Sequence, residues 1–461
     1  MTLDERAEHA GAAARQQLAQ LAVPSAHEGI GAARRRGRRR WVALGASATA
    51  VSAVVALIAV ATALSGTHAT TVHIRPAGGG PSPSTSTSVG TGVPGGSVPQ
   101  GFTAWSVSFP SVQDGWALGA ACATLPCPAI VLRTTDRGQT WASIPAPLTK
   151  VSIDFKSGVT SIHFADATNG WVFGTELWAT HDGGAHWAQP TLAGVPTDAY
   201  VKTLATADGT VSASVVDGKT NGGGTGCCTR IRIASSPVNR DDWQFSATIG
   251  RPYDLATDAQ LVLRGQTGWA IPAALPQYPS VGARLEHGVW KPWQLPCPQS
   301  TSEDPARYYH PFVAAADATD LVVVCSQGFS IQPPSPPPSE PVYFSTDGGS
   351  TFHPAARPIP VSTNAVADPT PGTVIVEGLT PDLTSTLRAT FDGGDTWATV
   401  YTAHPTGGGP GAWSFQDLTF VTPSRGLALY VHNGTGGQAV LLLTIDGGRH
   451  WSPLPFQSAH S

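Results

Sequence analysis

Five copies of one eight-residue motif give this chain of 461 residues a repeating organisation. Each copy has Ser or Thr first, Asp two residues later, Gly four residues later, and Trp or Phe seven residues later. The copies are TTDRGQTW from Thr134, THDGGAHW from Thr180, STDGGSTF from Ser345, TFDGGDTW from Thr390 and TIDGGRHW from Thr444. They begin 46, 165, 45 and 54 residues apart, and the long interval has room for two more units. Periods of roughly 20 to 50 residues are typical of repeat folds.

Further repeats fill the rest of each unit. Two degraded copies lie in the long interval, SSPVNRDDW from Ser235 and LEHGVWKPW ending at Trp293. A Gly-Trp-apolar element precedes several copies, at 114–120, 169–175, 267–273 and 425–431, and alternating apolar segments such as WSVSF (105–109) precede three of these. Each unit therefore predicts four short strands, which is typical of a propeller blade. The sequence predicts an all-β fold, a single seven-bladed β-propeller of four-stranded blades over residues 101–456.

The composition agrees with many short strands joined by tight turns. The chain has 51 Gly, 40 Pro and 14 Trp, and only 13% of its residues are charged. We expect Trp116, Trp171 and Trp269 of the Gly-Trp elements to lie in the core of the blades. These bulk numbers favour strands over helices.

Each motif copy is expected to be a turn clamp. The Asp carboxylate can accept backbone N–H groups two or three residues on, the glycines tolerate positive φ, the Ser or Thr can bond across the turn, and the aromatic side chain covers it. A calcium site would need six to eight oxygen ligands, and five equivalent acids around a ring cannot all serve one catalytic centre. The residues assigned to this structural role are Asp136, Gly138, Trp141, Asp182, Gly184, Trp187, Asp347, Gly349, Phe352, Asp392, Gly394, Trp397, Asp446, Gly448 and Trp451.

The five copies resemble the Asp box, or BNR repeat, of sialidases, sortilin-type receptors, two-propeller xyloglucanases and Ycf48-like photosystem assembly factors. The Gly-Trp-Ala-x-Gly element before the box is most similar to the last group. The resemblance covers residues 101–456. It implies that the box is the hairpin between the third and fourth strands of a blade, on the periphery and away from the central funnel where ligands bind.

Two functions follow from this resemblance. The first is a non-enzymatic binding or assembly module that holds a protein or glycan ligand at the funnel or rim of the propeller. The alternative is a sialidase-like glycoside hydrolase, which by the family pattern needs three funnel arginines, a Tyr/Glu pair and an acidic proton donor. Its Arg-Ile-Pro element is missing before Thr134, and RPIP at Arg357 comes late in the chain. We therefore expect no catalytic residues and no cofactor.

The N-terminal segment predicts a membrane anchor. Residues 41–64 contain no charged residue and are long enough to cross a bilayer, and the cluster RRRGRRR (Arg34–Arg40) before them predicts a cytoplasmic N-terminus over residues 1–40. Residues 65–100 read as a flexible Gly/Pro/Ser/Thr linker, and residues 457–461 as a tail. The propeller would then lie outside the cell membrane. A cleaved signal peptide is the alternative, because Ala61-Thr62-Ala63 resembles a cleavage site.

The charge distribution argues against nucleic acid as a partner. Of the 27 Lys+Arg and 31 Asp+Glu in the chain, residues 1–40 hold eight arginines and four acids, so the remainder has a formal charge of -8. Nucleic-acid-binding domains carry basic patches instead.

The six cysteines are an even number and all follow the predicted anchor: Cys122, Cys127, Cys227, Cys228, Cys297 and Cys325. In an exported domain this favours disulfides over metal ligands, and neither C-x-x-C nor a nearby pair of histidines supports zinc. Six cysteines allow 15 pairings. We expect the local pairs Cys122 with Cys127 and Cys297 with Cys325, which leaves Cys227 and Cys228 as a vicinal bridge or as reactive thiols.

Overall fold

The computed structural model describes residues 87–88, 96–122, 125–152, 157–195, 199–217, 230–249, 259–272, 281–298, 310–326, 339–403, 413–432 and 438–459. All of them belong to the compact unit Ser82–Ser461. The regular secondary structure in these ranges is β-strand throughout, which confirms the predicted fold class. The predicted cytoplasmic tail and the transmembrane segment 41–64 lie outside these ranges, and within them no helix is long and apolar enough to span a membrane.

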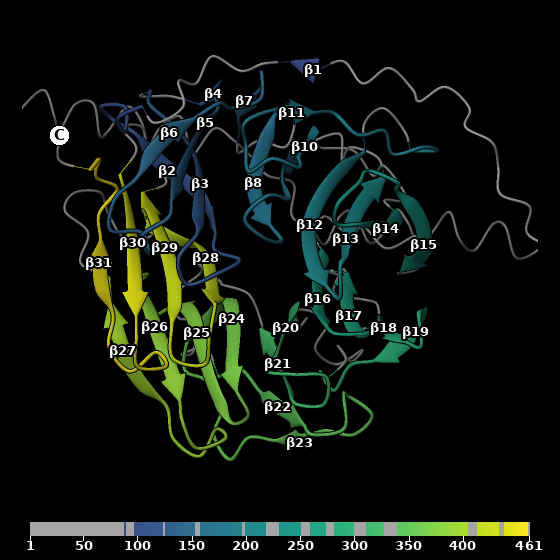
Figure 1. Cartoon of the computed structure of the whole chain (residues 1–461). Coiled ribbons are helices and arrows are strands. Elements are labelled where there is room, and N and C mark those ends of the chain that lie inside the picture. Colours follow the sequence, from purple (N-terminus) through teal and green to yellow (C-terminus); the bar gives the residue numbers. More distant parts are fainter. Residues whose placement is uncertain are drawn as a thin grey trace, which may run out of the picture. The chain divides into compact units, whose positions relative to one another are not determined.

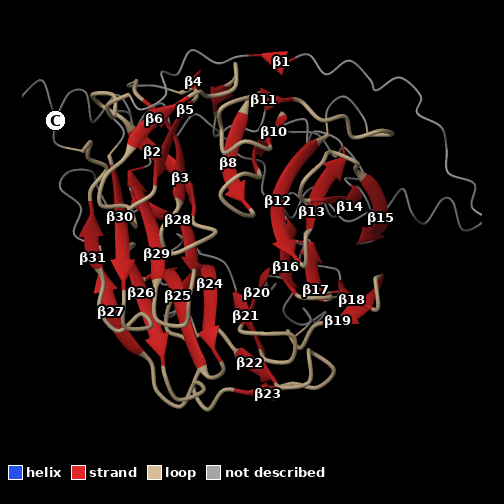
Figure 2. Ribbon diagram, viewed as in Figure 1, coloured by secondary structure: helices blue, strands red, loops and turns tan. Residues whose placement is uncertain are grey.

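Seven β-sheets are arranged around a common centre, one for each predicted unit (Figure 1; Figure 2). We number these blades 1 to 7 in chain order, and within each blade the first strand is innermost. The seven-bladed propeller of four-stranded blades is thereby confirmed.

The strands of the first four blades have the following bounds. Blade 1 contains β2 (Thr103–Ser108), β3 (Gly115–Ala120), β5 (Ile130–Thr134) and β6 (Ala142–Ile144). Blade 2 contains β8 (Val159–Phe164), β9 (Gly170–Gly174), β10 (Leu177–Thr180) and β11 (Trp187–Ala188). Blade 3 contains β12 (Tyr200–Ala207), β13 (Thr210–Asp217), β14 (Arg230–Pro237) and β15 (Gln244–Ile249). Blade 4 contains β16 (Ala259–Arg264), β17 (Thr267–Pro272), β18 (Val281–Glu286) and β19 (Val289–Gln294).

The remaining blades follow the same order. Blade 5 contains β20 (His310–Ala315), β21 (Leu321–Ser326), β22 (Val342–Ser345) and β23 (His353–Pro354). Blade 6 contains β24 (Ser362–Thr370), β25 (Thr373–Leu379), β26 (Ser385–Thr390) and β27 (Ala398–Thr402). Blade 7 contains β28 (Trp413–Phe420), β29 (Gly426–His432), β30 (Ala439–Thr444) and β31 (Ser452–Leu454).

The sheet of blade 2 has three additional short strands. On its outer edge β1 (Thr87–Ser88) pairs with β11, and on its inner side β7 (Lys150–Val151) joins β8 and also pairs with β4 (Cys127–Pro128). Gly96 bridges Ser143 on the outer strand of blade 1. Parts of the segment that we expected to be a flexible linker are therefore hydrogen-bonded to blade edges, where they satisfy backbone groups that an edge strand leaves unpaired.

The ring closes by packing between blades 7 and 1, without exchange of a strand between them. Phe456, which follows the last strand, lies 5.1 Å from Trp141 and 5.6 Å from Phe102 between ring centroids. The Trp141 backbone N–H donates to the Gln457 carbonyl at 2.8 Å. The segment after residue 456, predicted as a tail, therefore takes part in closing the propeller.

The core consists of apolar layers between neighbouring blades. The largest fully buried side chains include Trp116, Trp171 and Trp269, which confirms the expected core role of the Gly-Trp elements. The Trp116 indole stacks on Phe164 of the next blade, with 3.8 Å between centroids and 7° between planes. Because each blade is covered by the next, these large rings are buried only when neighbouring blades pack together.

The two faces of the propeller carry different connections. On one face, which we call the box face, the tight turn between the first and second strands of a blade bonds to the motif of the same blade, as in Gly183 N–H to Thr168 O at 2.8 Å and Gly447 N–H to Ser424 O at 2.9 Å. The opposite loop face carries the longer connections, such as that between Asp217 and Arg230. Residues 218–229 and 327–338, which belong to such connections, lie outside the described residues.

Candidate functional site: the central funnel

The innermost strands of the seven blades surround the centre of the propeller (Figure 1). A cavity of about 820 Å³, which we call the funnel, lies among blades 7, 1, 2 and 3. A second cavity of about 610 Å³, which we call the box-side cavity, is lined by the ends of the inner strands of blades 2 to 7. The two share five lining residues, His163, Leu204, Thr206, Leu418 and Thr419, so they adjoin. The funnel lies within the range of roughly 300 to 1,000 Å³ that is usual for ligand sites.

A β-bulge recurs at the same level in five of the inner strands. In each case the pairing with the second strand skips one residue: between Ala104 and Ser106, Val159 and Ser161, Val201 and Thr203, Thr363 and Ala365, and Phe415 and Asp417. The skipped residues are Trp105, Thr160, Lys202, Asn364 and Gln416, and we call them the bulge ring. Bulges redirect a side chain and are frequent beside functional sites.

Four members of the bulge ring line the funnel: Trp105, Thr160, Lys202 and Gln416. Gln416 is exposed, and Trp105 is partly buried. Four different blades therefore contribute one polar or aromatic group each to the same cavity: an indole, a hydroxyl, an ammonium and an amide. This combination offers one flat apolar surface and several donors and acceptors, which suits the recognition of a polar ligand.

The residue after the bulge joins one inner strand to the next. The Asp417 carboxylate accepts the N–H of Val107 at 2.7 Å, and the Ser106 hydroxyl accepts the N–H of Ile162 at 3.2 Å. The Gln260 side chain accepts the N–H of Val313 at 3.0 Å in the same way. Because no further strand pairs with these parts of the inner strands, these side chains satisfy backbone donors that would otherwise face the cavity unpaired.

Two titratable groups of the funnel are strongly perturbed by their surroundings. Burial raises the pKa of Asp417 to about 6, although hydrogen bonds from Val107 and Ser106 act in the opposite direction. Burial lowers the pKa of His163 to about 4, and its Nε2 lies 3.1 Å from the Thr206 hydroxyl. The His163 imidazole is therefore neutral at pH 7, so it contributes hydrogen bonding and no charge.

The described lining of both cavities contains one arginine, Arg264, and neither a tyrosine nor a glutamate. The sialidase alternative requires three arginines and a Tyr/Glu pair in the funnel. Arg357, in the late RPIP element, lies beside the motif of blade 6, where its carbonyl accepts the Trp397 indole N–H at 3.2 Å. In the described part of the funnel the residues that this alternative needs do not come together.

The five motif copies lie in the hairpins between the third and fourth strands, away from both cavities. In each, the leading hydroxyl donates to the first carboxylate oxygen of the Asp at 2.7–2.9 Å and accepts the N–H of the Gly four residues on at 2.8–2.9 Å. Gly184, Gly349, Gly394 and Gly448 have φ between 88° and 98°, a region that favours glycine.

The seventh residue of the motif, directly before the aromatic residue, completes the clamp. Its role was not predicted from the sequence. Its N–H donates to the Asp at 2.9–3.0 Å, and its side chain contacts the second carboxylate oxygen at 2.6–2.7 Å. The position is Thr or His in all five copies: Thr140, His186, Thr351, Thr396 and His450. The restriction of this position to Thr and His is the feature of the sequence from which its hydrogen-bonding role could have been predicted.

These hydrogen bonds keep the motif carboxylates ionised. The pKa of Asp446 is lowered to about 2, because hydrogen bonds from His450 and Thr444 outweigh its desolvation. The pKa of Asp392 is lowered to about 2 by Thr396 and Thr390, and that of Asp347 is lowered mainly by Thr351. Charged acceptors form stronger hydrogen bonds than neutral ones, so each carboxylate holds its hairpin closed.

Indole N–H groups connect one blade to the motif of the next. Trp116 donates to the Gly183 carbonyl at 3.3 Å, and Trp269 donates to the Gly348 carbonyl at 3.0 Å. At the closing junction Arg425 reaches the Arg137 carbonyl, the matching position in blade 1, at 2.9 Å. The motif thus joins blades as well as closing its own turn.

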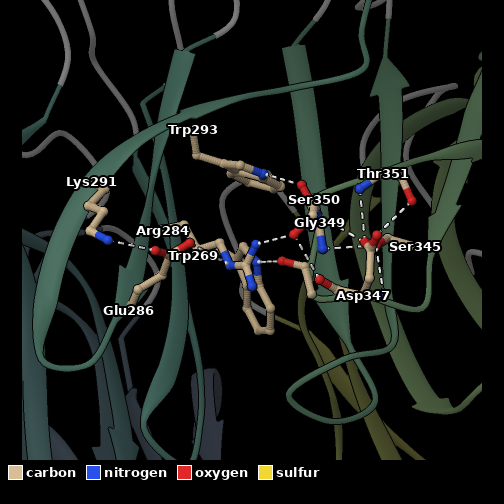
Figure 3. A network of polar contacts seen from close by, with 11 residues as sticks. Trp269, Arg284, Glu286, Lys291, Trp293, Ser345, Asp347, Gly349, Ser350 and Thr351 are labelled. Carbon is tan, nitrogen blue, oxygen red and sulfur yellow. Dashed lines mark hydrogen bonds and ion pairs between the residues drawn. The ribbon is translucent and has the colours of Figure 1, made fainter.

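The junction between blades 4 and 5 shows both roles together (Figure 3). Trp293, the aromatic residue of the degraded copy in blade 4, donates to the Gly349 carbonyl at 2.8 Å. The side chain of Phe352 in blade 5 has no N–H to donate, and the indole of Trp293 from the neighbouring blade donates to this carbonyl instead. Arg284 bonds the Ser350 hydroxyl at 2.8 Å on the same hairpin.

The degraded copy of blade 3 leaves a buried donor unsatisfied. Trp171 of blade 2 faces this copy, its indole Nε1 is buried, and it has no hydrogen-bond partner among the described residues. The copy lacks the double glycine whose carbonyls accept indole N–H groups at other junctions. His181 links the same two blades, since its Nε2 lies 3.1 Å from the Asp241 carboxylate of blade 3.

Two disulfides are formed, Cys122–Cys127 and Cys297–Cys325, and both are the expected local pairs. Cys297 and Cys325 are buried and join the end of blade 4 to the second strand of blade 5. Cys227 and Cys228 lie outside the described residues. In the described ranges no group of three or more His, Cys, Asp or Glu side chains is placed to hold a metal ion.

Fold and site together define this part of the chain as a seven-bladed β-propeller with a polar central funnel. No family model matches the chain, and no curated protein matches it. Among solved structures it is similar to the polysaccharide lyase Uly1, with a TM-score of 0.50 and 10% identity over 75% of this chain and 90% of the other.

Two further solved structures are similar over most of the described chain. Ycf48 bound to D1 peptide has a TM-score of 0.45 and 20% identity, covering 76% of this chain and 93% of the other. The GH74 enzyme of Niastella koreensis has a TM-score of 0.37 and 12% identity, covering 77% and 71%. At such low identities a likeness shows the fold alone. Propellers of this kind include both binding proteins and enzymes.

Proposed function

We propose that this chain is a membrane-anchored, extracytoplasmic propeller that binds a protein or glycan ligand in its funnel without catalysing a reaction. The bulge ring carries the proposal. Five blades depart from regular pairing at the same level, and four of the side chains concerned line one cavity of about 820 Å³. Bulges cost hydrogen bonds in the ladder, so their repetition at the funnel favours a binding role there.

The chemistry of the lining supports binding over catalysis. Among the polar side chains of the lining, hydroxyl groups predominate, and the two charged side chains of the funnel are Lys202 and Asp417. Asp417 already accepts the Val107 N–H, which gives it a structural role. A glycosidase needs two carboxyl groups placed on either side of a scissile bond.

Binding should depend on bulge-ring residues. We expect Gln416→Ala and Trp105→Leu to weaken binding of the ligand identified by glycan-array and peptide-library screening of the purified chain, each by tenfold or more. Asp382→Asn is the matched control, because Asp382 is an exposed residue on the loop face that lies outside both cavities. Equal binding by all three variants would exclude the funnel as the site.

Catalysis is tested separately. Purified protein incubated with 4-methylumbelliferyl sialosides and glucosides should release no fluorophore above the buffer rate. Release that is lost in Asp417→Asn would establish the hydrolase alternative instead.

The anchor and topology rest on the sequence of residues 34–64. Protease treatment of intact cells should digest residues beyond 100 and leave the N-terminal tail protected. Protection of the propeller would contradict the proposed location.

A further inference from the structure

An aspartate occupies a position in blade 6 where other blades have phenylalanine. In blades 1, 2 and 7 a phenylalanine lies at the end of the inner strand: Phe109, Phe164 or Phe420. Its ring covers the glycine that begins the second strand of the same blade. The register of β24 on β25 places Asp368 at the equivalent position, directly after Ala367. An ionisable residue that breaks a repeat in this way suggests a functional site.

The backbone around Asp368 is also exceptional. Besides the bulge that it shares with four other inner strands, β24 has a second register shift between Ala367 and Thr370. The other described inner strands show no shift at this level. The second shift contains Asp368 and Pro369, and it directs this segment to the wall of the box-side cavity.

The Asp368 side chain is buried without full compensation. It is 7% exposed, and its Oδ1 has no hydrogen-bond partner among the described residues. No ion pair within 4.0 Å is formed between Asp368 and Arg264, which lines the same cavity from blade 4. A buried carboxyl group in this condition is unfavourable for folding and becomes favourable when a cation pairs with it.

The charges around the cavity favour a cationic occupant. Arg264 contributes one positive charge, whereas Asp317 and Asp320 lie on the blade 5 turn between Arg264 and Asp368 and contribute two negative charges. Asp317 accepts N–H groups of Thr319 and Asp320, and these bonds hold its pKa below the usual range, so it is ionised. The carboxyl groups do not form a cluster that could coordinate a metal ion in the described residues.

We propose that the box-side cavity is a second ligand site, which takes a primary ammonium or guanidinium group of a peptide, with Asp368 as its counter-ion. The cavity volume of about 610 Å³ is ample for a lysine or arginine side chain. The site shares part of its wall with the funnel, but it has other charged residues, Arg264 and Asp368, and it is formed by the box-face ends of the inner strands.

The proposal has a pH signature. Burial raises the pKa of Asp368 to about 8, in spite of the Ala316 N–H and Arg264, which act in the opposite direction. A bound cation would ionise the carboxyl group, so binding should release a proton below pH 8 and strengthen by up to about tenfold for each pH unit between 6 and 8. The other charged or titratable side chains near Asp368 are His163, Arg264, Asp317 and Asp320. Between pH 6 and pH 8, His163 stays neutral and Asp317 stays ionised, so neither accounts for a pH dependence of binding.

The test uses calorimetry on the purified full-length chain with three probes, N-acetyl-Ala-Lys-Ala-amide, the same peptide with norleucine, and the same peptide with glutamate. We expect the lysine peptide to bind and the other two not to bind. n-Butylammonium chloride is a fourth probe, and weaker binding of it would show that peptide contacts add to the ammonium group. Titrations in buffers of different ionisation enthalpy measure the released proton in the wild-type chain.

Three variants complete the test. Asp368→Asn should weaken the lysine peptide at least tenfold at pH 8 and abolish the pH dependence, whereas Asp208→Asn should have no effect. Asp208 is an exposed aspartate on the same face with φ of 47°, which asparagine also tolerates, and it lies outside the cavity. Arg264→Gln should leave binding unchanged or strengthen it.

Several outcomes would overturn the proposal. One is binding of the glutamate peptide to the wild-type chain that is lost in Arg264→Gln. Another is binding of the lysine peptide without release of a proton. The third is binding of the lysine peptide that remains unchanged in Asp368→Asn. Because the proton measurement needs no variant, it decides the matter even if Asp368→Asn folds poorly. Loss of funnel binding in Gln416→Ala with intact lysine-peptide binding would separate this site from the funnel.

Discussion

The indole N–H of Trp116 donates to the carbonyl oxygen of Gly183 at 3.3 Å, between residues 67 positions apart in the chain. Trp171 occupies the same position one blade later, and its buried N–H has no partner among the described residues. The same residue type in the same strand is thus satisfied at one junction and unsatisfied at the next. The difference comes from the motif of the following blade.

This pair gives a direct test of the junction. Trp116→Phe should lower the free energy of unfolding by about 1 kcal/mol more than Trp171→Phe does, because only the first removes a hydrogen bond. Both variants keep an aromatic ring in the layer, so their packing losses are comparable. Urea unfolding followed by far-UV circular dichroism measures the difference. A larger loss for Trp171→Phe would contradict the assignment of the two indoles.

The motif clamp can be tested in the last blade. Asp446→Asn should lower the free energy of unfolding by about 1 kcal/mol, because a charged acceptor of several hydrogen bonds becomes a neutral amide on a partly exposed hairpin. Ligand binding in the funnel should not change. Loss of binding with an unaltered melting temperature would show that the motif has a role other than closing its turn.

Acid should weaken the same clamps. The folded-state pKa of Asp446 is about 2, below the ordinary aspartate value of 3.8, so its contribution is present above pH 3.8 and is lost as the pH falls through about 2. In thermal melts between pH 5 and pH 2, the difference between wild type and Asp446→Asn should therefore shrink toward zero. A difference that stays constant over this interval would show that Asp446 is not hydrogen-bonded as an anion.

Asp368 should give the opposite pH dependence. Its folded-state pKa of about 8 lies above the ordinary aspartate value of 3.8, so the folded state loses stability relative to the unfolded state as the pH rises from 4 to 8. The limiting slope is about 1.4 kcal/mol for each pH unit. Asp368→Asn should become progressively more stable than wild type over this interval, and the gap should be constant above pH 8. Melting temperatures at one-unit steps measure it, and parallel curves would contradict the burial of an uncompensated carboxyl group.

The two disulfides should differ in their effect on stability. Replacing both Cys297 and Cys325 by Ala should cost roughly 3 to 4 kcal/mol, whereas replacing Cys122 and Cys127 should cost about 2 kcal/mol, because the closed loops contain different numbers of residues. The separations are 28 and 5 residues. Guanidinium unfolding of the two double variants measures this, and an equal cost would indicate that loop entropy does not govern either bridge.

The number of blades could be predicted because each blade repeats a local pattern. The motif from Thr444 to Trp451 contains almost all of its own partners, since Thr444, Asp446, Gly448 and His450 bond to one another within seven residues. Local hydrogen bonding of this kind is visible as spacing in the sequence. Disulfide pairing could be predicted for the same reason, because each bridge joins two cysteines that are close together in the sequence.

The funnel could not be predicted, because its residues carry no common spacing or type. Trp105, Lys202 and Gln416 share a place only through the register between the first and second strands of their blades. For Asp368 the sequence contains one indication of a special role. When the inner strands are aligned, this aspartate occupies the position of Phe109, Phe164 and Phe420. The pairing of Thr87, within the expected linker, could not be predicted either, because its partner Ala188 is 101 residues away in the chain.

The sequence by itself determined the repeat, the strand order within a blade and the residues that close each outer hairpin, because short-range hydrogen bonds and alternating burial fix these locally. Only the tertiary structure decided which side chains meet at the centre and which donors stay unpaired. Those outcomes depend on how seven blades close into one ring. A one-residue shift in the pairing of an inner strand changes the side chain that faces the funnel.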